Sequence, residues 1–212
     1  MHIEKNLSKM LKDDNIKLIQ KMAQQNTYFL QFQSDFPSKI VEEVKVRTLF
    51  TMQVPQKKDY FGLPGETPTE EEAEVLKSNL EKMRKKVTNF GKSISQLPNM
   101  QVTFYTRAKA MEICFGDPNN EEPNIAASIL RSVLKLNANV RMLVVQNIVL
   151  SGGSSMIPGF KLRVKQEMEY LINNYKEFEE LATLKPHIKF AESYFPPNCM
   201  AWVGASIMSG LN

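Results

Sequence analysis

A glycine-rich turn between an apolar segment and a helix is the strongest structural signal in the sequence. Residues 148–150 are apolar and are expected to form a buried strand, and Gly152 and Gly153 follow almost at once. A Pro-Gly pair then leads into a helix expected to begin near Phe160. Because glycine has no Cβ, such a turn lets the backbone approach a ligand closely, and its free N–H groups can face a nucleotide. Taken alone the pattern is only moderately specific, because glycine pairs at strand ends are more often simple turns.

Composition excludes several functional classes. The 212 residues are 42% hydrophobic and 24% charged, so the chain can bury a core. A net charge of +4, from 27 basic and 23 acidic residues, is too small and too interspersed to indicate nucleic-acid binding. Two cysteines and two histidines provide neither a disulfide scaffold nor a zinc cluster. The best apolar stretch, residues 142–150, contains Gln146 and Asn147, so we expect a soluble chain with no membrane insertion.

The N-terminal third is expected to be mostly helical. Apolar residues at three- and four-residue spacing predict a helix over residues 3–25, broken at Asp13, Asp14 and Asn15. Ser38 is expected to cap a short helix over residues 39–46. Residues 48–54 are β-like.

A loop and a charged helix are expected next. Residues 56–67 have the composition of a surface loop. Thr67 as N-cap, Pro68 at the first helical position and Glu70 in a capping box predict the start of the helix. Its two ends carry opposite charge: Glu70, Glu71, Glu72 and Glu74 at the start, and Lys82, Arg84, Lys85 and Lys86 at the end. Both clusters complement the helix dipole, and a solvated surface helix is favoured over a partner-binding one.

Shorter elements are expected in the following segment. Residues 101–104 resemble a strand, and residues 112–115 are expected to form a second short one. Residues 116–123 form a turn or an exposed loop. A helix begins at Ile125 and ends at residues 137–139. Residues 141–145 form either another turn of helix or the approach to the next strand.

Three sequence blocks, taken together, are similar to actin and the actin-related proteins. The first is Ser-Gly-Gly-Ser-Ser-Met-Ile-Pro-Gly at residues 151–159, which matches a family motif that precedes a helix. The second is Trp-Val-Gly-Ala-Ser-Ile at residues 202–207. The third, at residues 40–47, resembles the family's Ile-Val-x-x-Ile-Lys helix. The resemblance implies an α/β, actin-like (ribonuclease H-like) fold.

The resemblance also implies a division of the chain. It covers mainly the second large lobe of the actin fold with its small helical subdomain, so the chain is expected to act as part of something that completes it. Residues 1–54 would belong to the small subdomain and the entry to the large lobe. Residues 55–100 would be a surface insertion with the charged helix, and residues 101–212 the core of the large lobe.

The family resemblance implies a nucleotide site, weakened here. The residues that it assigns to this site are Lys45, Gly152, Gly153, Ser154, Met156 and Ile157. Two positions depart from the family: Val46 replaces a glutamate that grips the ribose, and Asn198 replaces a lysine beside the adenine. Losing a charged hydrogen-bond partner costs about 1.5–3 kcal/mol. Binding of ATP or ADP is therefore expected to be weak or absent.

No catalytic residues are expected, and no metal ligands. The phosphate-gripping hairpins and the water-orienting residue of the family lie in the first part of its fold and are not found here. His2 and His187 are isolated, and His187 is expected at a strand edge. Cys199 is expected to be a buried small hydrophobe, and Trp202 a core residue.

The blocks at residues 44–48, 155–160 and 198–202 resemble one divergent member of the family, a subunit at the pointed end of the dynactin filament. This implies a non-catalytic structural subunit that supports dynein-based microtubule transport in the cytoplasm. Its partners would be an actin-related filament subunit and the other pointed-end subunits of dynactin. Two alternatives remain: a fixed structural subunit of another assembly, axonemal (in a cilium) or organellar, and a nucleotide-responsive switch.

Overall fold

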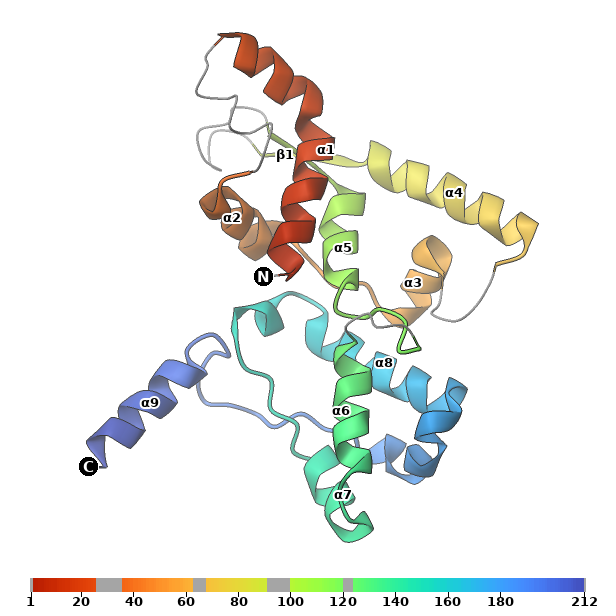
Figure 1. Ribbon diagram of the computed structural model, residues 1–212, viewed down its shortest axis with the longest axis vertical. Coiled ribbons are helices and arrows are strands. Elements are labelled where there is room, and N and C mark those ends of the chain that lie inside the picture. The colour runs from red at the N-terminus through yellow and green to blue at the C-terminus, as the bar shows by residue number, and fades with distance from the viewer. Residues whose placement is uncertain (1, 26–35, 63–67, 91–99, 120–123, 212) are drawn as a thin grey trace. The chain divides into compact units, whose positions relative to one another are not determined.

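The computed structural model describes residues 2–25, 36–62, 68–90, 100–119 and 124–211 (Figure 1). They form two compact units, Met1–Pro123 (unit 1) and Asn124–Asn212 (unit 2). The divisions predicted after residues 54 and 100 were based on sequence motifs, and they stay a prediction. By contacts, the segment 55–100 supplies α3, α4 and β1 to unit 1.

Unit 1 is mainly helical and contains a two-stranded sheet. Its elements are α1 (His2–Gln25), α2 (Ser38–Thr48), α3 (Val54–Phe61), α4 (Glu70–Lys85), β1 (Val87–Phe90), β2 (Met100–Thr103) and α5 (Phe104–Glu112). β1 and β2 are antiparallel, with Val87 opposite Thr103 and Phe90 opposite Met100. The predicted strand at residues 101–104 is thus confirmed, shifted by one residue.

The predicted break in α1 is wrong, because the polar residues there bind the sheet. The Asn15 side chain accepts a hydrogen bond from the Gln101 N–H (2.8 Å) and donates to the Gln101 carbonyl (2.7 Å). Asp14 accepts from the Thr103 N–H (3.0 Å) and the Thr106 hydroxyl (2.7 Å). The helix continues through both residues, and its buried Leu7, Leu11 and Ile19 lie in the core of unit 1.

The segment after α2 is a second helix, where the sequence suggested β structure and a loop. α3 spans Val54–Phe61, and the chain between it and α2 forms no strand. The Gln56 side chain accepts a hydrogen bond from the Gln53 N–H (3.4 Å), and a proline lies at the start of the helix. Lys57 is buried and pairs with Glu112. Residues 63–67 of the expected loop lie outside the described residues.

Two predicted helix starts and one predicted strand are wrong. α4 begins at Glu70 with Thr69 as N-cap: the Thr69 hydroxyl accepts from the Glu72 N–H, and the Glu72 carboxylate accepts from the Thr69 N–H (2.9 Å). Thr67 itself lies outside the described residues. Pro37, not Ser38, is the N-cap of α2. Residues 112–115 form no strand, because α5 extends to Glu112.

The described residues of unit 2 form helices and include a parallel bridge between Ile148 and Phe190. Its elements are α6 (Ile125–Leu134), α7 (Ala138–Val145), the 3₁₀ segment η2 (Gly153–Met156), α8 (Phe160–Asn174), the 3₁₀ segment η3 (Lys176–His187) and α9 (Met200–Gly210). The first helix ends at Leu134, earlier than expected, and residues 141–145 are helical. Phe160, Val164, Met168 and Leu171 of α8 are buried in the core of this unit.

Four expectations for unit 2 are wrong. The expected buried strand at residues 148–150 is reduced to one bridge, Ile148 to Phe190, and Val149 is 58% exposed. His187 is the last residue of η3, so it does not lie at a strand edge. Cys199 is exposed, and Trp202 is 73% exposed. Trp202 lies in α9, which buries none of its residues, and Cys199 is the N-cap of that helix.

Candidate functional site

The glycine turn in unit 2 has the open backbone that a ligand could approach. Gly152 adopts a φ of +97°, which favours glycine, and its N–H donates to the Pro197 carbonyl (2.9 Å). A Cβ added at Gly152 or Gly153 would meet nothing within 4 Å. Ser154, also assigned to the site, is half-buried in η2. The turn therefore leaves one face of the backbone uncovered by the described residues.

Two serine hydroxyls at this turn contact backbone carbonyls, one within the turn and one at Pro197. Ser155 Oγ donates to the Gly152 carbonyl (2.7 Å), and Ser151 Oγ lies 3.5 Å from the Pro197 carbonyl. A pocket of about 350 Å³ lies beside the turn, and Ser155, Lys161 and Glu192 are among its lining. The Lys161 Nζ lies 5.6 Å from the centre of the Phe190 ring. These contacts stabilise the turn itself.

The two residues after the serines differ in exposure. Met156 is 50% exposed and can contact a ligand. Ile157 is 7% exposed, so its side chain lies in the interior rather than on the face of the turn. The family resemblance could not distinguish them, because a motif match carries no information about which side chains pack inward.

Lys45 lies in unit 1, on α2, and is paired with two carboxylates. Its Nζ lies 2.8 Å from Glu4 Oε1 on α1 and is also paired with Glu42, one turn earlier on α2. Burial lowers the pKa of Lys45, but the hydrogen bonds and charges of the two glutamates outweigh it and raise that pKa above its ordinary value. The hydrogen bond from Lys45 holds the pKa of Glu4 below its ordinary value. Val46 is 69% exposed, and its side chain has no hydrogen-bonding atom.

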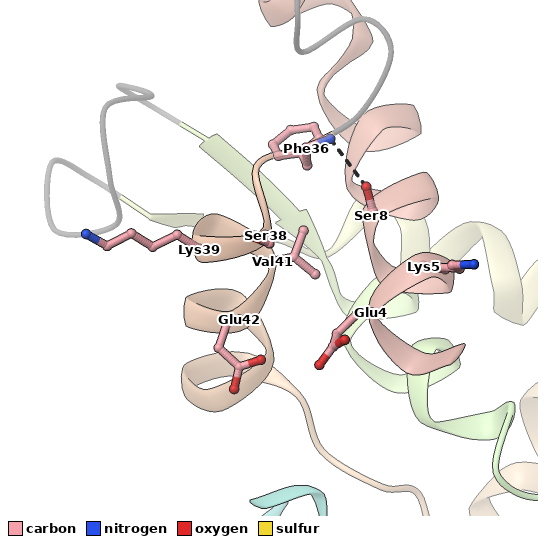
Figure 2. A pocket seen from close by; sticks show the side chains of 8 residues that line it. All are labelled: Glu4, Lys5, Ser8, Phe36, Ser38, Lys39, Val41 and Glu42. Carbon is pink, nitrogen blue, oxygen red and sulfur yellow. Dashed lines mark hydrogen bonds between the residues drawn. The ribbon is translucent and has the colours of Figure 1, made fainter. Parts of the chain in front are cut away.

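Sequence reasoning missed a pocket between α1 and α2 (Figure 2). Its volume is about 480 Å³, and its lining is Glu4, Lys5, Ser8, Phe36, Ser38, Lys39, Val41 and Glu42. The Phe36 N–H donates to Ser8 Oγ (3.3 Å) and joins the two segments. Glu4 and Glu42, on its two sides, are the partners of Lys45. No motif spacing indicates this pocket, because its lining comes from segments about 30 residues apart.

Cys114 follows the end of α5 and is half-buried. Burial, with the nearby Glu112 charge, raises the pKa of the Cys114 thiol to about 11, so it is a poor nucleophile at neutral pH. Among the described residues no cluster of three or more His, Cys, Asp or Glu could hold a metal ion. In the described helices, none is both long enough and apolar enough to span a membrane.

Comparison with known proteins identifies relatives of this chain. A protein-family model described as "Actin" matches residues 2–212. Actin-related protein 10 of Dictyostelium discoideum is 36% identical over 94 residues, which are 43% of this chain and 20% of that protein. Putative actin-29 of the same organism is 32% identical over 96 residues, 44% of this chain and 22% of that protein. The matched part of the chain thus spans about a fifth of the length of these curated relatives.

Proposed function

The chain belongs to the actin family, and from that premise we propose that it serves as a non-catalytic structural subunit of a protein assembly. The assembly we propose is dynactin, with the chain at the pointed end of its filament, in the cytoplasm and cytoskeleton. Family membership over residues 2–212 confirms the expected actin-like fold class. The family match covers nearly the whole chain, including the segments between the three sequence blocks.

One observation carries the dynactin proposal. The 36% identity is to a protein named actin-related protein 10, and three blocks of this chain resemble the divergent family member at the dynactin pointed end. These blocks lie in both units, since residues 44–48 are in unit 1 and residues 155–160 and 198–202 are in unit 2. The proposed partners are therefore an actin-related filament subunit and the other pointed-end subunits.

The proposed absence of catalysis is supported by how the expected nucleotide residues are used. Lys45 is paired with Glu4 and Glu42, so its charge is already balanced. Ile157 is buried, and Val46 replaces the ribose-binding glutamate of the family. Of the residues assigned to the nucleotide site, Gly152 and Gly153 have an open backbone and Met156 is 50% exposed. These residues fit an adenine nucleotide poorly, and we assign no step of the function to one.

Native purification tests the partner proposal. The full chain, tagged, is isolated from its own cells under native conditions, and co-purifying proteins are quantified by mass spectrometry against an untagged strain. Dynactin subunits are expected at amounts comparable to the chain. Their complete absence would refute the dynactin assignment, and a reproducible axonemal or organellar set would support the alternative assembly.

A second assay on the same material tests the nucleotide expectation. The native complex is denatured, and released adenine nucleotide is measured by chromatography relative to the amount of this chain. Because dynactin-type filaments contain other actin-related subunits, the tagged chain purified alone serves as the matched sample. Substoichiometric nucleotide is expected from the chain alone, whereas one nucleotide per chain would contradict the proposal of weak or absent binding.

A further inference from the structure

The C-terminal end of α4 carries a cluster of unbalanced positive charge. Lys82, Arg84, Lys85 and Lys86, here called the basic end of α4, are all exposed. No carboxylate in the described part of the chain forms an ion pair with them, in contrast to Lys45 and Arg47 on α2. Their charge therefore faces solvent.

Two of these cations are held in place by aromatic rings. The Arg84 guanidinium lies 4.8 Å from the centre of the Tyr105 ring, and the Lys86 Nζ lies 5.1 Å from the centre of the Phe104 ring. Each ring contacts a second one: Tyr105 lies 6.0 Å from Phe61, and Phe104 lies 5.0 Å from Phe50. A contact of a cation with a ring restrains a long side chain during folding. Less conformational entropy then remains to be lost when a partner binds.

The second rings also contact cations. The Lys109 Nζ lies 4.8 Å from the centre of the Phe61 ring, and the Arg107 guanidinium lies 5.3 Å from the centre of the Phe50 ring. Arg107 also donates to the Thr48 carbonyl (2.8 Å), so it connects the rings to the end of α2. Through these cation–ring and ring–ring contacts, the basic end of α4 packs against α3 and α5. The contacts hold it in place within unit 1.

The helix dipole accounts for only part of this charge. The C-terminus of a helix carries the equivalent of about half a negative charge, which one cation offsets. The basic end of α4 has four cations, and the exposed Glu81 beside them offsets another of these charges. About two positive charges remain, enough to attract an anionic segment at physiological ionic strength.

The other end of α4 limits the shape of the partner. Glu70, Glu71, Glu72 and Glu74 are exposed at its start. At 1.5 Å per residue they lie about 20 Å along the helix from the basic end. A nucleic acid or an anionic membrane extending along α4 would meet these carboxylates and be repelled, whereas a short acidic segment that covers only the basic end would not.

We infer that the basic end of α4 docks a carboxylate-rich segment of a protein partner. This inference rests on the proposed function as a structural subunit and assigns a surface of unit 1 to the assembly. The rings position Arg84 and Lys86, and the exposed Lys82 and Lys85 extend the positive surface beside them.

Zero-length crosslinking tests the inference in the native complex. A carbodiimide joins a lysine amine to a carboxylate only when the two are in contact. Crosslinks are expected from Lys82, Lys85 or Lys86 to Asp or Glu residues of one other polypeptide. If partners co-purify but none of these lysines is crosslinked to them, the inference is overturned and the proposed function stands. If no partner co-purifies, the proposed function fails first.

Matched variants of the full chain provide a second test. Lys82→Gln with Lys85→Gln removes two charges that contact no ring, so folding is expected to be unaffected. Lys135→Gln with Lys176→Gln removes two exposed charges of unit 2 and is the control. The probe is a fluorescent oligoglutamate peptide, measured by anisotropy. The α4 variant is expected to weaken its binding about fivefold, and the control to leave it unchanged.

Two outcomes of the variant experiment would overturn the inference. One is equal binding of the peptide to the α4 variant, the control and the wild-type chain. The other is tighter binding of a DNA duplex or of phosphatidylserine vesicles than of the peptide, lost in the α4 variant only. The second result would reassign the basic end of α4 to a nucleic acid or a membrane.

Discussion

Asn15 takes the place of a neighbouring strand at one edge of the small sheet in unit 1. The Phe104 N–H donates to the Lys86 carbonyl beside the pair Val87 and Thr103. Bonding alternates along an antiparallel ladder, so the polar backbone groups of Gln101 face away from β1. The buried Asn15 amide bonds to both of them.

We predict that Asn15→Ala lowers the free energy of unfolding by about 2–4 kcal/mol, because two backbone groups of Gln101 lose their partner. Urea denaturation monitored by circular dichroism measures the change. Gln101→Ala is the control: its side chain is exposed and its backbone bonds remain, so a change within about 0.5 kcal/mol is expected. Equal losses in both variants would contradict the prediction.

Asp14 gives a pH-dependent prediction. Burial raises the pKa of its carboxyl above the ordinary value, and the hydrogen bonds from Thr103 and Thr106 offset this only in part. The native state then binds the proton more tightly than the unfolded state, so ionisation opposes folding as the pH rises through the folded pKa. Asp14→Asn keeps an acceptor for both donors and removes the charge.

The expected result for Asp14→Asn is a chain more stable than wild type at neutral pH. This gain should shrink to nothing as the pH falls below the ordinary pKa of an aspartate, where the wild-type carboxyl is also neutral. Urea midpoints at several pH values measure it. A variant that is less stable than wild type by the same amount at every pH would show that the charge itself is needed.

The sequence indicated which polar and charged residues matter, but it did not indicate which residues they contact. Asp14 and Asn15 were recognised as unusual within a helix, but their partners lie more than 80 residues away in β2 and α5. Lys45 was found through a family motif, yet its pairing with Glu4 depends on how α1 packs on α2. Such contacts follow from tertiary packing, which local sequence does not encode.

At the scale of elements, α4 shows how a strong local signal can be misplaced. Its capping box lies at Thr69 and Glu72, two residues after the predicted one. Both Thr67 and Thr69 have an acidic residue three positions later, so sequence spacing alone cannot choose between them. The charge gradient along the helix was predicted correctly.

We predict that Thr69→Ala lowers the free energy of unfolding by about 1 kcal/mol, since the Glu72 N–H loses its acceptor. Thr69→Ser keeps the hydroxyl and should retain most of that stability. Thermal or urea unfolding compares the three proteins. A serine variant as unstable as the alanine variant would show that the Thr69 methyl group, rather than the cap, is responsible.

α9 is a weakly attached helix of unit 2, because none of its residues is buried. In the isolated chain its amides should exchange with solvent far faster than those of α8, which has a buried face. Hydrogen exchange with mass spectrometry measures this. Trp202→Ala is expected to change the free energy of unfolding by less than about 0.5 kcal/mol. Strong protection of α9 amides would contradict this picture.

At the scale of the whole molecule, each unit has its own core. Leu11→Ala should cost about 2–5 kcal/mol and should reduce amide protection in α1, β2 and α5, while α6 and α8 keep theirs. Leu171→Ala in α8 is the complementary variant: it should reduce amide protection in α6 and α8, while α1, β2 and α5 keep theirs. Hydrogen exchange measures the amide protection of each unit in both variants. Loss of protection throughout the chain in either variant would show a single cooperative core.

The family could be recognised from sequence, but the two units could not. The glycine turn, the tryptophan block and residues 40–47 match motifs of one family, so together they indicate the fold class. The boundary between the units follows from how α3, α4 and the strands pack together, and motif content placed divisions elsewhere. The sequence also did not predict the exposure of Trp202. Its apolar neighbours suggest burial, but they do not show which element would cover α9.

The docking of α1 on β2 has a consequence for how this protein can diverge. In most hairpins the connecting turn determines which residues of the two strands face each other. Here Asn15 and Asp14 fix the position of β2 from a separate helix. A change at Asn15 or Asp14 can therefore shift β2 against β1. We expect these two residues to diverge more slowly than the other polar residues of α1.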